Sequence, residues 1–311
     1  MKLFGAISMF ACVLCVNLAQ PAQAEISSLP ANVATEIAAM GPNLNPDLIS
    51  KTFALIRPLV PAPPASVKIT KDVSYGDDPL QKIDIDQPAT GRNLPIAIYV
   101  HGGGFVRGDK GDYSNIVAYF AEHGIVGVNA NYRLAPKVTW PAESEDVGAV
   151  VAFVKKHAAE YGGNPRRIIV IGHSAGANLV ASYVLDPSLH PRSGSGVVGA
   201  VLISGPAYRA ASIAPPDKTY FGADESQYGK RVPGTYLKTS KTPLFIVTAE
   251  FDPISLAPES YDLAARTCAR DGKCPRFLYL KGHNHISEVA AIGSKDDQLG
   301  RGLTNFINTA R

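Results

Sequence analysis

The chain has 311 residues, of which 46% are hydrophobic and 18% are charged, so it is long enough to bury a large core. The formal net charge of +3 is small, and the lysines and arginines are scattered, with no basic run and no basic patch interleaved with aromatic residues. This pattern argues against nucleic acid as a partner and indicates a globular protein with a solvated surface.

Residues 1–24 have the pattern of a secretory signal. Lys2 supplies a positive charge, residues 3–18 are mostly apolar, and Ala22-Gln23-Ala24 fits a small-x-small cleavage site. A retained membrane anchor is the alternative, but the apolar run is short, is interrupted by Asn17 and is followed by no basic cluster. We therefore expect cleavage after Ala24, a periplasmic or secreted protein, and no stable membrane insertion.

Cleavage would leave two cysteines, Cys268 and Cys274, because Cys12 and Cys15 lie within the signal. In an oxidising compartment this pair predicts a disulfide that closes a small loop around Asp271-Gly272. Zinc binding is the poorer alternative, because no set of Cys and His residues has the spacing of a zinc site.

The mature chain divides into a proline-rich leading segment and a long alternation of strands and helices. Residues 25–66 contain a helix that begins at Pro46 with Asn45 as its cap, and we expect this segment to lie over the rest of the chain. Eight segments are predicted to be strands: residues 67–75, 81–86, 95–100, 125–130, 167–171, 197–204, 243–249 and 276–280. Helices are predicted at residues 113–123, 143–161 and 175–185, and from about residue 286 to the C-terminus.

Apolar strands that alternate with helices predict an α/β fold, with a mostly parallel, twisted, eight-stranded sheet flanked by helices. The first two strands are expected to form an antiparallel hairpin. Residues 205–242, rich in Pro, Gly and Tyr, interrupt the alternation. We therefore predict one domain over residues 25–311, with a small cap from about residues 25–66 and 205–242.

The motif Gly172-His173-Ser174-Ala175-Gly176 lies between a predicted strand and a predicted helix. A tight turn in this position strains the serine backbone and exposes its hydroxyl at the end of the sheet, while the flanking glycines relieve crowding. Ser174 is therefore the candidate nucleophile, and a plain structural turn is the alternative.

Donors for an oxyanion are predicted in His101-Gly102-Gly103-Gly104, which directly follows an apolar strand. Consecutive glycines let backbone amides approach a ligand closely. The amides of Gly103, Gly104 and Ala175 would form a three-donor oxyanion hole.

The acid and the base are expected in the loops after the last two strands, in the chain order Ser, Asp, His. Asp252 is favoured over Glu250 because it lies further into its loop, and His285 is favoured over His283 because it lies just before the terminal helix. His101 is interpreted as a structural residue of the oxyanion loop.

Together these motifs resemble those of the hormone-sensitive-lipase-like esterases, a family of α/β-hydrolases. The resemblance runs from about Val67 to the C-terminus and includes Asn131-Tyr132-Arg133-Leu134-Ala135-Pro136, Trp140-Pro141-Ala142, Asp146, Thr248-Ala249-Glu250-Phe251-Asp252-Pro253 and the Gly282-x-x-His285 loop. It implies a triad of Ser174, Asp252 and His285, and it implies that Arg133 and Asp146 form a structural ion pair. His173 stands where this family usually has Asp, and this feature is shared with arylformamidases and with feruloyl or sugar-acetyl esterases.

The sequence thus predicts an exported serine carboxylesterase for a small-molecule ester with a short acyl or small aromatic group. Neither a metal nor an organic cofactor is required. Phe105, Tyr220 and Phe221 are candidates to contact the substrate, with packing of the cap onto the sheet as the alternative. An arylformamidase-like amide hydrolase and a feruloyl or sugar-acetyl esterase remain alternatives that use the same triad, and a non-catalytic binding protein is a third class.

Overall fold

The structure is a computed structural model that describes residues 27–310. The predicted signal of residues 1–24 lies outside the described residues. Among the residues that the structure describes, no helix is both long enough and apolar enough to cross a membrane.

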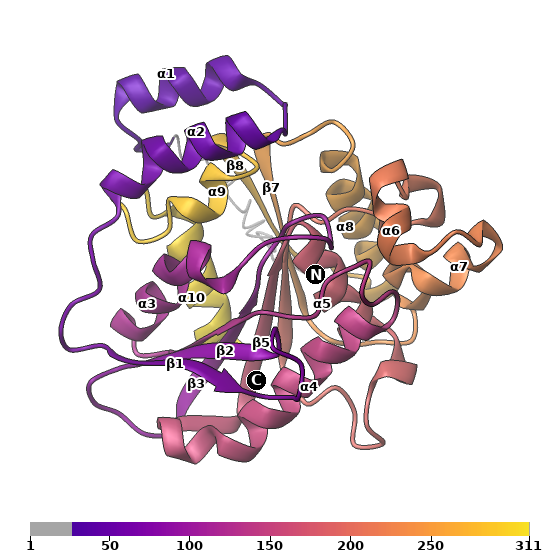
Figure 1. Ribbon diagram of the computed structural model, residues 1–311, viewed down its shortest axis with the longest axis horizontal. Helices are drawn as coiled ribbons and strands as arrows, with labels where there is room; N and C mark the ends of the chain where they lie inside the picture. The colour runs from indigo at the N-terminus through magenta and orange to yellow at the C-terminus, as the bar shows by residue number, and fades with distance from the viewer. Residues whose placement is uncertain (1–26, 311) are drawn as a thin grey trace, which may run out of the picture.

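An eight-stranded sheet runs through the middle of the molecule (Figure 1), in the order β1-β2-β4-β3-β5-β6-β7-β8. Its strands are β1 Lys68–Ser74, β2 Lys82–Gln87, β3 Leu94–Val100, β4 Val126–Ala130, β5 Gly163–His173, β6 Gly199–Ile203, β7 Leu244–Phe251 and β8 Arg276–Asn284. Strand β2 is antiparallel to both of its neighbours, and all other neighbouring strands are parallel. The predicted sheet and its antiparallel start are confirmed.

Helices cover both faces of this sheet. The helices of the described residues are α1 Ala31–Met40, α2 Pro46–Ile56, α3 Ser114–Glu122, α4 Ala142–His157, α5 Ala175–Leu185, α6 Lys218–Phe221, α7 Tyr228–Arg231, α8 Ala257–Asp271, α9 Ser287–Ala290 and α10 Gln298–Thr309. Helices α4, α5 and α8 pack on one face, and α3 and α10 pack on the other (Figure 1).

Strand β6 shows why central strands are apolar throughout. Ala200 and Leu202 pack in the hydrophobic core between the sheet and helices α4, α5 and α8. Val201 and Ile203 pack in the core on the other face, with α3 and α10, because successive side chains of a strand point to opposite faces. Burial on both sides leaves no polar face, which is the pattern that marked these segments as strands in the sequence.

Strand β8 extends further than predicted, to Asn284 rather than to residue 280. Asn284 pairs with Phe251 after a register shift in β7, and Gly282 adopts a φ of +80° that lets the strand bend through the irregularity. The extension carries the candidate histidine loop beyond the end of β7.

The N-terminal helices α1 and α2 lie next to α9 and the end of β8 (Figure 1). Helix α2 begins as predicted, with the Asn45 side chain accepting a hydrogen bond from the backbone N–H of Leu48 at 3.0 Å. Ile37 and Ile56 are fully buried against a small core that includes Ile286, so the leading segment packs directly on the residue after His285.

Two further predicted contacts are present. Cys268 and Cys274 form a disulfide, with the left-handed Gly272 in the loop between them. Arg133 holds the buried Asp146 through its Nε and Nη2 atoms, with Nη2 2.7 Å from Oδ1. This bidentate pair ties the loop after β4 to α4.

Candidate active site

Ser174 occupies the sharp turn between β5 and α5, with φ of 54° and ψ of −126°. A side chain on Gly172 would place its Cβ 2.2 Å from Gly176 O, and one on Gly176 would place it 2.2 Å from Val100 O. Only glycine fits at either position, so the turn brings β3, β5 and α5 together around the serine. The predicted strained turn is confirmed.

The triple-glycine loop after β3 passes directly against this serine. A Cβ on Gly102 would lie 2.8 Å from Ser174 Cβ, and Gly103 and Gly104 line the same cavity as Ser174. Ala175 is the first residue of α5, so its N–H has no acceptor within the helix. The three predicted oxyanion donors therefore belong to segments that meet at Ser174.

His101 holds the start of this loop and lies inside the core. Its Nδ1 is 2.7 Å from Gly102 O, and its ring stacks on Tyr132 at a centroid distance of 4.5 Å. Tyr132 in turn donates its hydroxyl to His101 O at 2.9 Å. These contacts agree with the structural role expected for His101.

Asp252 and His285 form the buried acid–base pair of the site. His285 Nδ1 lies 2.8 Å from Asp252 Oδ1, and Asp252 Oδ2 accepts from Ser204 Oγ at 2.6 Å, Thr248 Oγ1 at 2.8 Å and Ala249 N at 2.9 Å. Burial opposes ionisation of this carboxyl, but His285 and these donors hold the pKa of Asp252 below its usual value. The carboxylate thus fixes the tautomer of His285 with its proton on Nδ1.

The two competing candidates lie elsewhere. His283 places Nδ1 3.1 Å from Ser287 Oγ and Nε2 3.4 Å from Asp296 Oδ2. Glu250 accepts the backbone N–H of Gly282 at 2.7 Å. Both contacts hold the bent end of β8, so the geometry selects Asp252 and His285 as the pair.

The other ring nitrogen of His285, Nε2, is available to act as a base. His285 Nε2 is buried and has no hydrogen-bond partner among residues 27–310, and both His285 and Ser174 line the same cavity. In unliganded sites of this kind the bond between nucleophile and base is often long and tightens with substrate. The arrangement can therefore accept a proton from Ser174.

The cavity above Ser174 has a volume of about 410 Å³. Its walls come from the oxyanion loop, from both predicted cap segments, and from the residues just after Asp252 and His285. The apolar wall consists of Leu44, Ile49, Phe53, Pro206, Ala214, Pro216, Leu256 and Ile286, and Arg107, Asp112 and Asp217 add charged or titratable groups. The sequence analysis did not predict that Leu256 and Ile286 line the cavity. Leu256 lies four residues after Asp252 and Ile286 one residue after His285, and this closeness to the triad could have indicated it.

Phe105, Tyr220 and Phe221 pack into the core rather than line the cavity. All three are fully buried, and the rings of Phe105 and Tyr220 stack with their centroids 4.5 Å apart. Tyr220 also forms a hydrogen bond to Ser144 Oγ at 3.0 Å. These three aromatic residues therefore pack between the cap and the oxyanion loop, as the alternative interpretation held, instead of forming the wall of the cavity.

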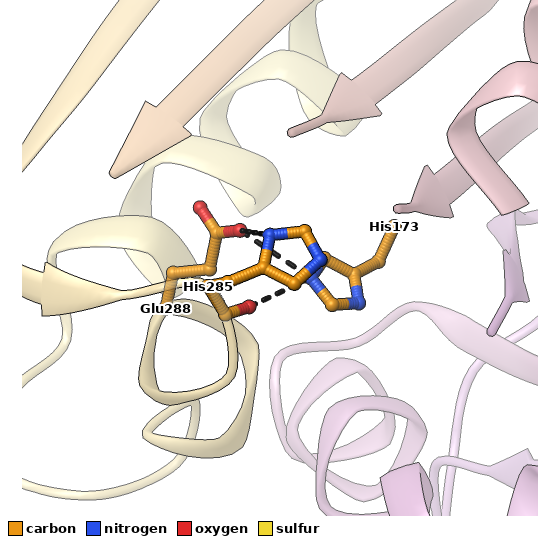
Figure 2. A group of neighbouring side chains, drawn as sticks. All are labelled: His173, His285 and Glu288. Atoms are coloured by element: carbon orange, nitrogen blue, oxygen red, sulfur yellow. Dashed lines mark hydrogen bonds and ion pairs between the residues drawn. The ribbon is translucent and has the colours of Figure 1, made fainter. Parts of the chain in front are cut away.

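Next to Asp252, His285 also belongs to a second buried group, which it forms with His173 and Glu288 (Figure 2). Sequence reasoning did not predict this group. Their ligand-type atoms lie within 4.8 Å of one another. The facing nitrogens already have partners, because His173 Nε2 bonds to His285 O at 2.8 Å and His285 Nδ1 bonds to Asp252. One nitrogen of each histidine is therefore engaged in a hydrogen bond within the protein.

Comparison with known proteins identifies the family of this fold. Residues 144–308, more than half of the chain, match a family model described as an alpha/beta hydrolase domain, and residues 83–186 match one described as BD-FAE. A solved structure of a truncated form of carbohydrate esterase from gut microbiota has the same fold, with a TM-score of 0.68 and 20% identity over 80% of this chain and 98% of that one.

Two curated relatives from Mycobacterium tuberculosis extend over most of the chain. Esterase LipQ is 27% identical over 76% of this chain and 62% of its own length, and carboxylesterase NlhH is 32% identical over 70% of this chain and 74% of its own. The chain spans only 28% and 31% of the length of two further relatives. The resemblance to esterases expected from the motifs is confirmed, and the chain belongs to the α/β-hydrolase family.

Proposed function

We propose that this protein is an exported serine carboxylesterase, with Ser174 as nucleophile, His285 as general base and Asp252 as the acid that orients the base. The observation that carries the proposal is the meeting of three separate segments at one cavity. A strained serine, a histidine paired through Nδ1 to a buried carboxylate, and a glycine loop against the serine are the parts that acyl transfer needs.

The reaction follows from where the protons can go. Ser174 Oγ attacks the ester carbonyl carbon while its proton moves to His285 Nε2, and the carbonyl oxygen takes up the electron pair. The amides of Gly103, Gly104 and Ala175 donate hydrogen bonds to that oxygen, and each such donor contributes about 3 kcal/mol.

Collapse of this intermediate breaks the bond to the alcohol, which leaves with the proton from His285. Water then attacks the acyl group on Ser174 and gives a proton to the same histidine. The bond from the acyl carbon to Ser174 Oγ then breaks, the serine oxygen takes that proton back from His285, and the carboxylic acid is released. Asp252 stays ionised throughout and stabilises the imidazolium that forms twice in each cycle.

The size and the walls of the cavity support a short acyl or small aromatic group as substrate. A volume of about 410 Å³ with mostly apolar walls lies within the range of small-molecule sites. Sugar esters are a second candidate, because Asp112 and Asp217 add polar groups to the wall and a protein of the same fold is a carbohydrate esterase.

Export rests on the sequence of residues 1–24, and the disulfide between Cys268 and Cys274 supports it, because such bonds persist in oxidising compartments. Mass spectrometry of the secreted or periplasmic protein should find Glu25 as the first residue. A chain that retains Met1 in the cytoplasm would contradict export without affecting the proposed chemistry.

The decisive test compares initial rates on p-nitrophenyl acetate, butyrate and octanoate for the wild type and for Ser174→Ala. We expect the short esters to be turned over and Ser174→Ala to lose at least about 10⁴-fold in kcat. The matched control is Ser226→Ala, an exposed serine of the cap, which should keep the wild-type rate.

Equal rates in the wild type and Ser174→Ala would refute the assigned nucleophile. If the folded wild type is inactive on all three esters, N-formylkynurenine and acetylated or feruloylated sugars separate the arylformamidase and sugar-esterase alternatives. Turnover of any of them that depends on Ser174 would keep the triad and revise only the substrate.

A further inference from the structure

Glu288 is a buried carboxyl that faces the same histidine as Asp252. It belongs to α9, three residues after His285, and is 1% exposed. Its Oε1 lies 3.8 Å from His285 Nδ1 and 3.3 Å from His173 Nε2 (Figure 2). Two carboxyls therefore approach one ring nitrogen, Asp252 at hydrogen-bond distance and Glu288 about 1 Å beyond it.

The carboxyl of Glu288 is unusual because both of its oxygens are buried with no standard hydrogen bond to any of residues 27–310. Burying a polar group in this way is costly, and buried carboxyls normally pair with cations or amides. Packing alone would be served better by an apolar side chain at this position, so the carboxyl calls for an explanation in terms of the site.

The titratable groups that face Glu288 are Asp252, His285, His173 and the buried Tyr99. Burial and the negative charge of Asp252 raise the pKa of Glu288 well above its usual range. Burial and the neighbouring His285 lower the pKa of His173 well below its usual range, so His173 supplies no positive charge. The negative charge of Asp252 therefore favours the protonated, neutral form of Glu288.

Building on the proposed function, we propose that Glu288 is a second acid for His285: a positioning residue that faces Nδ1 beside Asp252 and can take over its role when Asp252 is replaced by a neutral residue. In the wild type Asp252 makes the hydrogen bond and Glu288 contributes little. When the charge of Asp252 is removed, Glu288 can lose its proton to solvent as the pH rises, and its carboxylate can then close the gap to Nδ1.

Ser204 assists this exchange because it already lies beside both carboxyls. Its hydroxyl donates to Asp252 Oδ2 at 2.6 Å, and its proximity to Glu288 favours the ionised form of that carboxyl. The site thus already holds a hydroxyl beside both carboxyls, and in both cases the imidazole keeps its proton on Nδ1 and leaves the buried Nε2 unprotonated.

The test is a double-mutant cycle with Asp252→Asn, Glu288→Gln and the double variant, with kcat and KM measured from pH 6 to 10 on p-nitrophenyl butyrate. Glu288→Gln nearly preserves the shape and the neutral charge of the native carboxyl, so folding should be retained. We expect less than a tenfold loss of kcat in Glu288→Gln. A triad without a second acid loses about 10⁴-fold on the Asp-to-Asn change.

With the second acid in place, Asp252→Asn should lose only about 100-fold near pH 7 and should recover activity as the pH rises. The double variant should fall about 100-fold further, with KM unchanged and with no recovery at high pH. The matched control is Asp252→Asn/Asp296→Asn, because Asp296 is a buried carboxyl of the same region that faces His283. This control should behave like Asp252→Asn.

The proposal is overturned if the double variant and Asp252→Asn have the same kcat and the same pH profile. If the melting temperature of the double variant shows that it has lost its fold, Asp252→Asn/Glu288→Asp replaces it. Partial recovery of this variant at high pH is expected, and no recovery would contradict the proposal. Failure of the serine esterase function is a different result, because the wild type itself would then be inactive or insensitive to Ser174→Ala.

Discussion

The oxyanion loop offers a matched pair of substitutions, Gly103→Ala and Gly104→Ala, with opposite expected outcomes. A Cβ on Gly103 would lie 1.8 Å from Arg107 O and 2.6 Å from Arg107 C, and Gly103 has a φ of +137°. Nonbonded heavy atoms need about 3.5 Å, so the two segments must move apart by more than about 1.5 Å. At Gly104, with φ of +60°, no heavy atom of the described residues other than Gly104 and its two chain neighbours lies within 4 Å of the added Cβ.

The consequence for catalysis follows from how narrowly an oxyanion donor must be placed. A donor works at about 2.7–3.1 Å, so a shift of about 1.5 Å removes it, which costs about 10²–10³-fold in kcat, or about 3–4 kcal/mol. Gly103→Ala should show this loss. Gly104→Ala meets only the strain of a left-handed alanine, about 1–2 kcal/mol of stability, and should keep kcat within about tenfold of the wild type.

The assay is kcat on p-nitrophenyl butyrate at saturating substrate, with the melting temperature of each variant measured alongside. The reasoning is refuted if the two variants lose the same activity, or if Gly103→Ala keeps the wild-type kcat. A large fall in melting temperature for Gly104→Ala alone would also contradict the assignment of open space at that position.

Two predictions concern stability. Burial raises the pKa of Glu143 from 4.5 to about 9, so the folded state holds a proton that the unfolded chain has lost between these values, and stability falls as pH rises. In Glu143→Gln, the free energy of unfolding measured with urea should no longer fall by up to about 1.4 kcal/mol per pH unit between about pH 5 and 9. The control is Glu145→Gln at the exposed neighbour, whose plot of unfolding free energy against pH should run parallel to that of the wild type. Arg133→Ala leaves the Asp146 carboxylate, which is 1% exposed, without its cation. The free energy of unfolding in the same assay should fall by about 3 kcal/mol. A fall of less than about 1 kcal/mol would contradict the structural role of this ion pair.

The chemistry of this protein was readable from the sequence wherever it depends on local backbone demands. The glycines around Ser174 and the triple glycine after β3 are required by close approach and by positive φ, and those requirements leave a fixed spacing in the chain. The apolar strands were equally visible, because strands buried on both faces carry no polar side. The same holds for Asn45, whose cap is made within one helical turn.

Contacts between distant segments were decided by the tertiary structure alone. The sequence could rank His285 above His283, but only the bend of β8 places His285 Nδ1 on Asp252 and turns His283 toward Asp296. Aromatic residues of the cap looked suited to a pocket and instead pack beneath the loop, because aromatic character is equally suited to both places. Glu288 reads as an ordinary polar residue of a terminal helix until the fold buries it against His285, since burial and charge environment are properties of the packed chain rather than of local sequence.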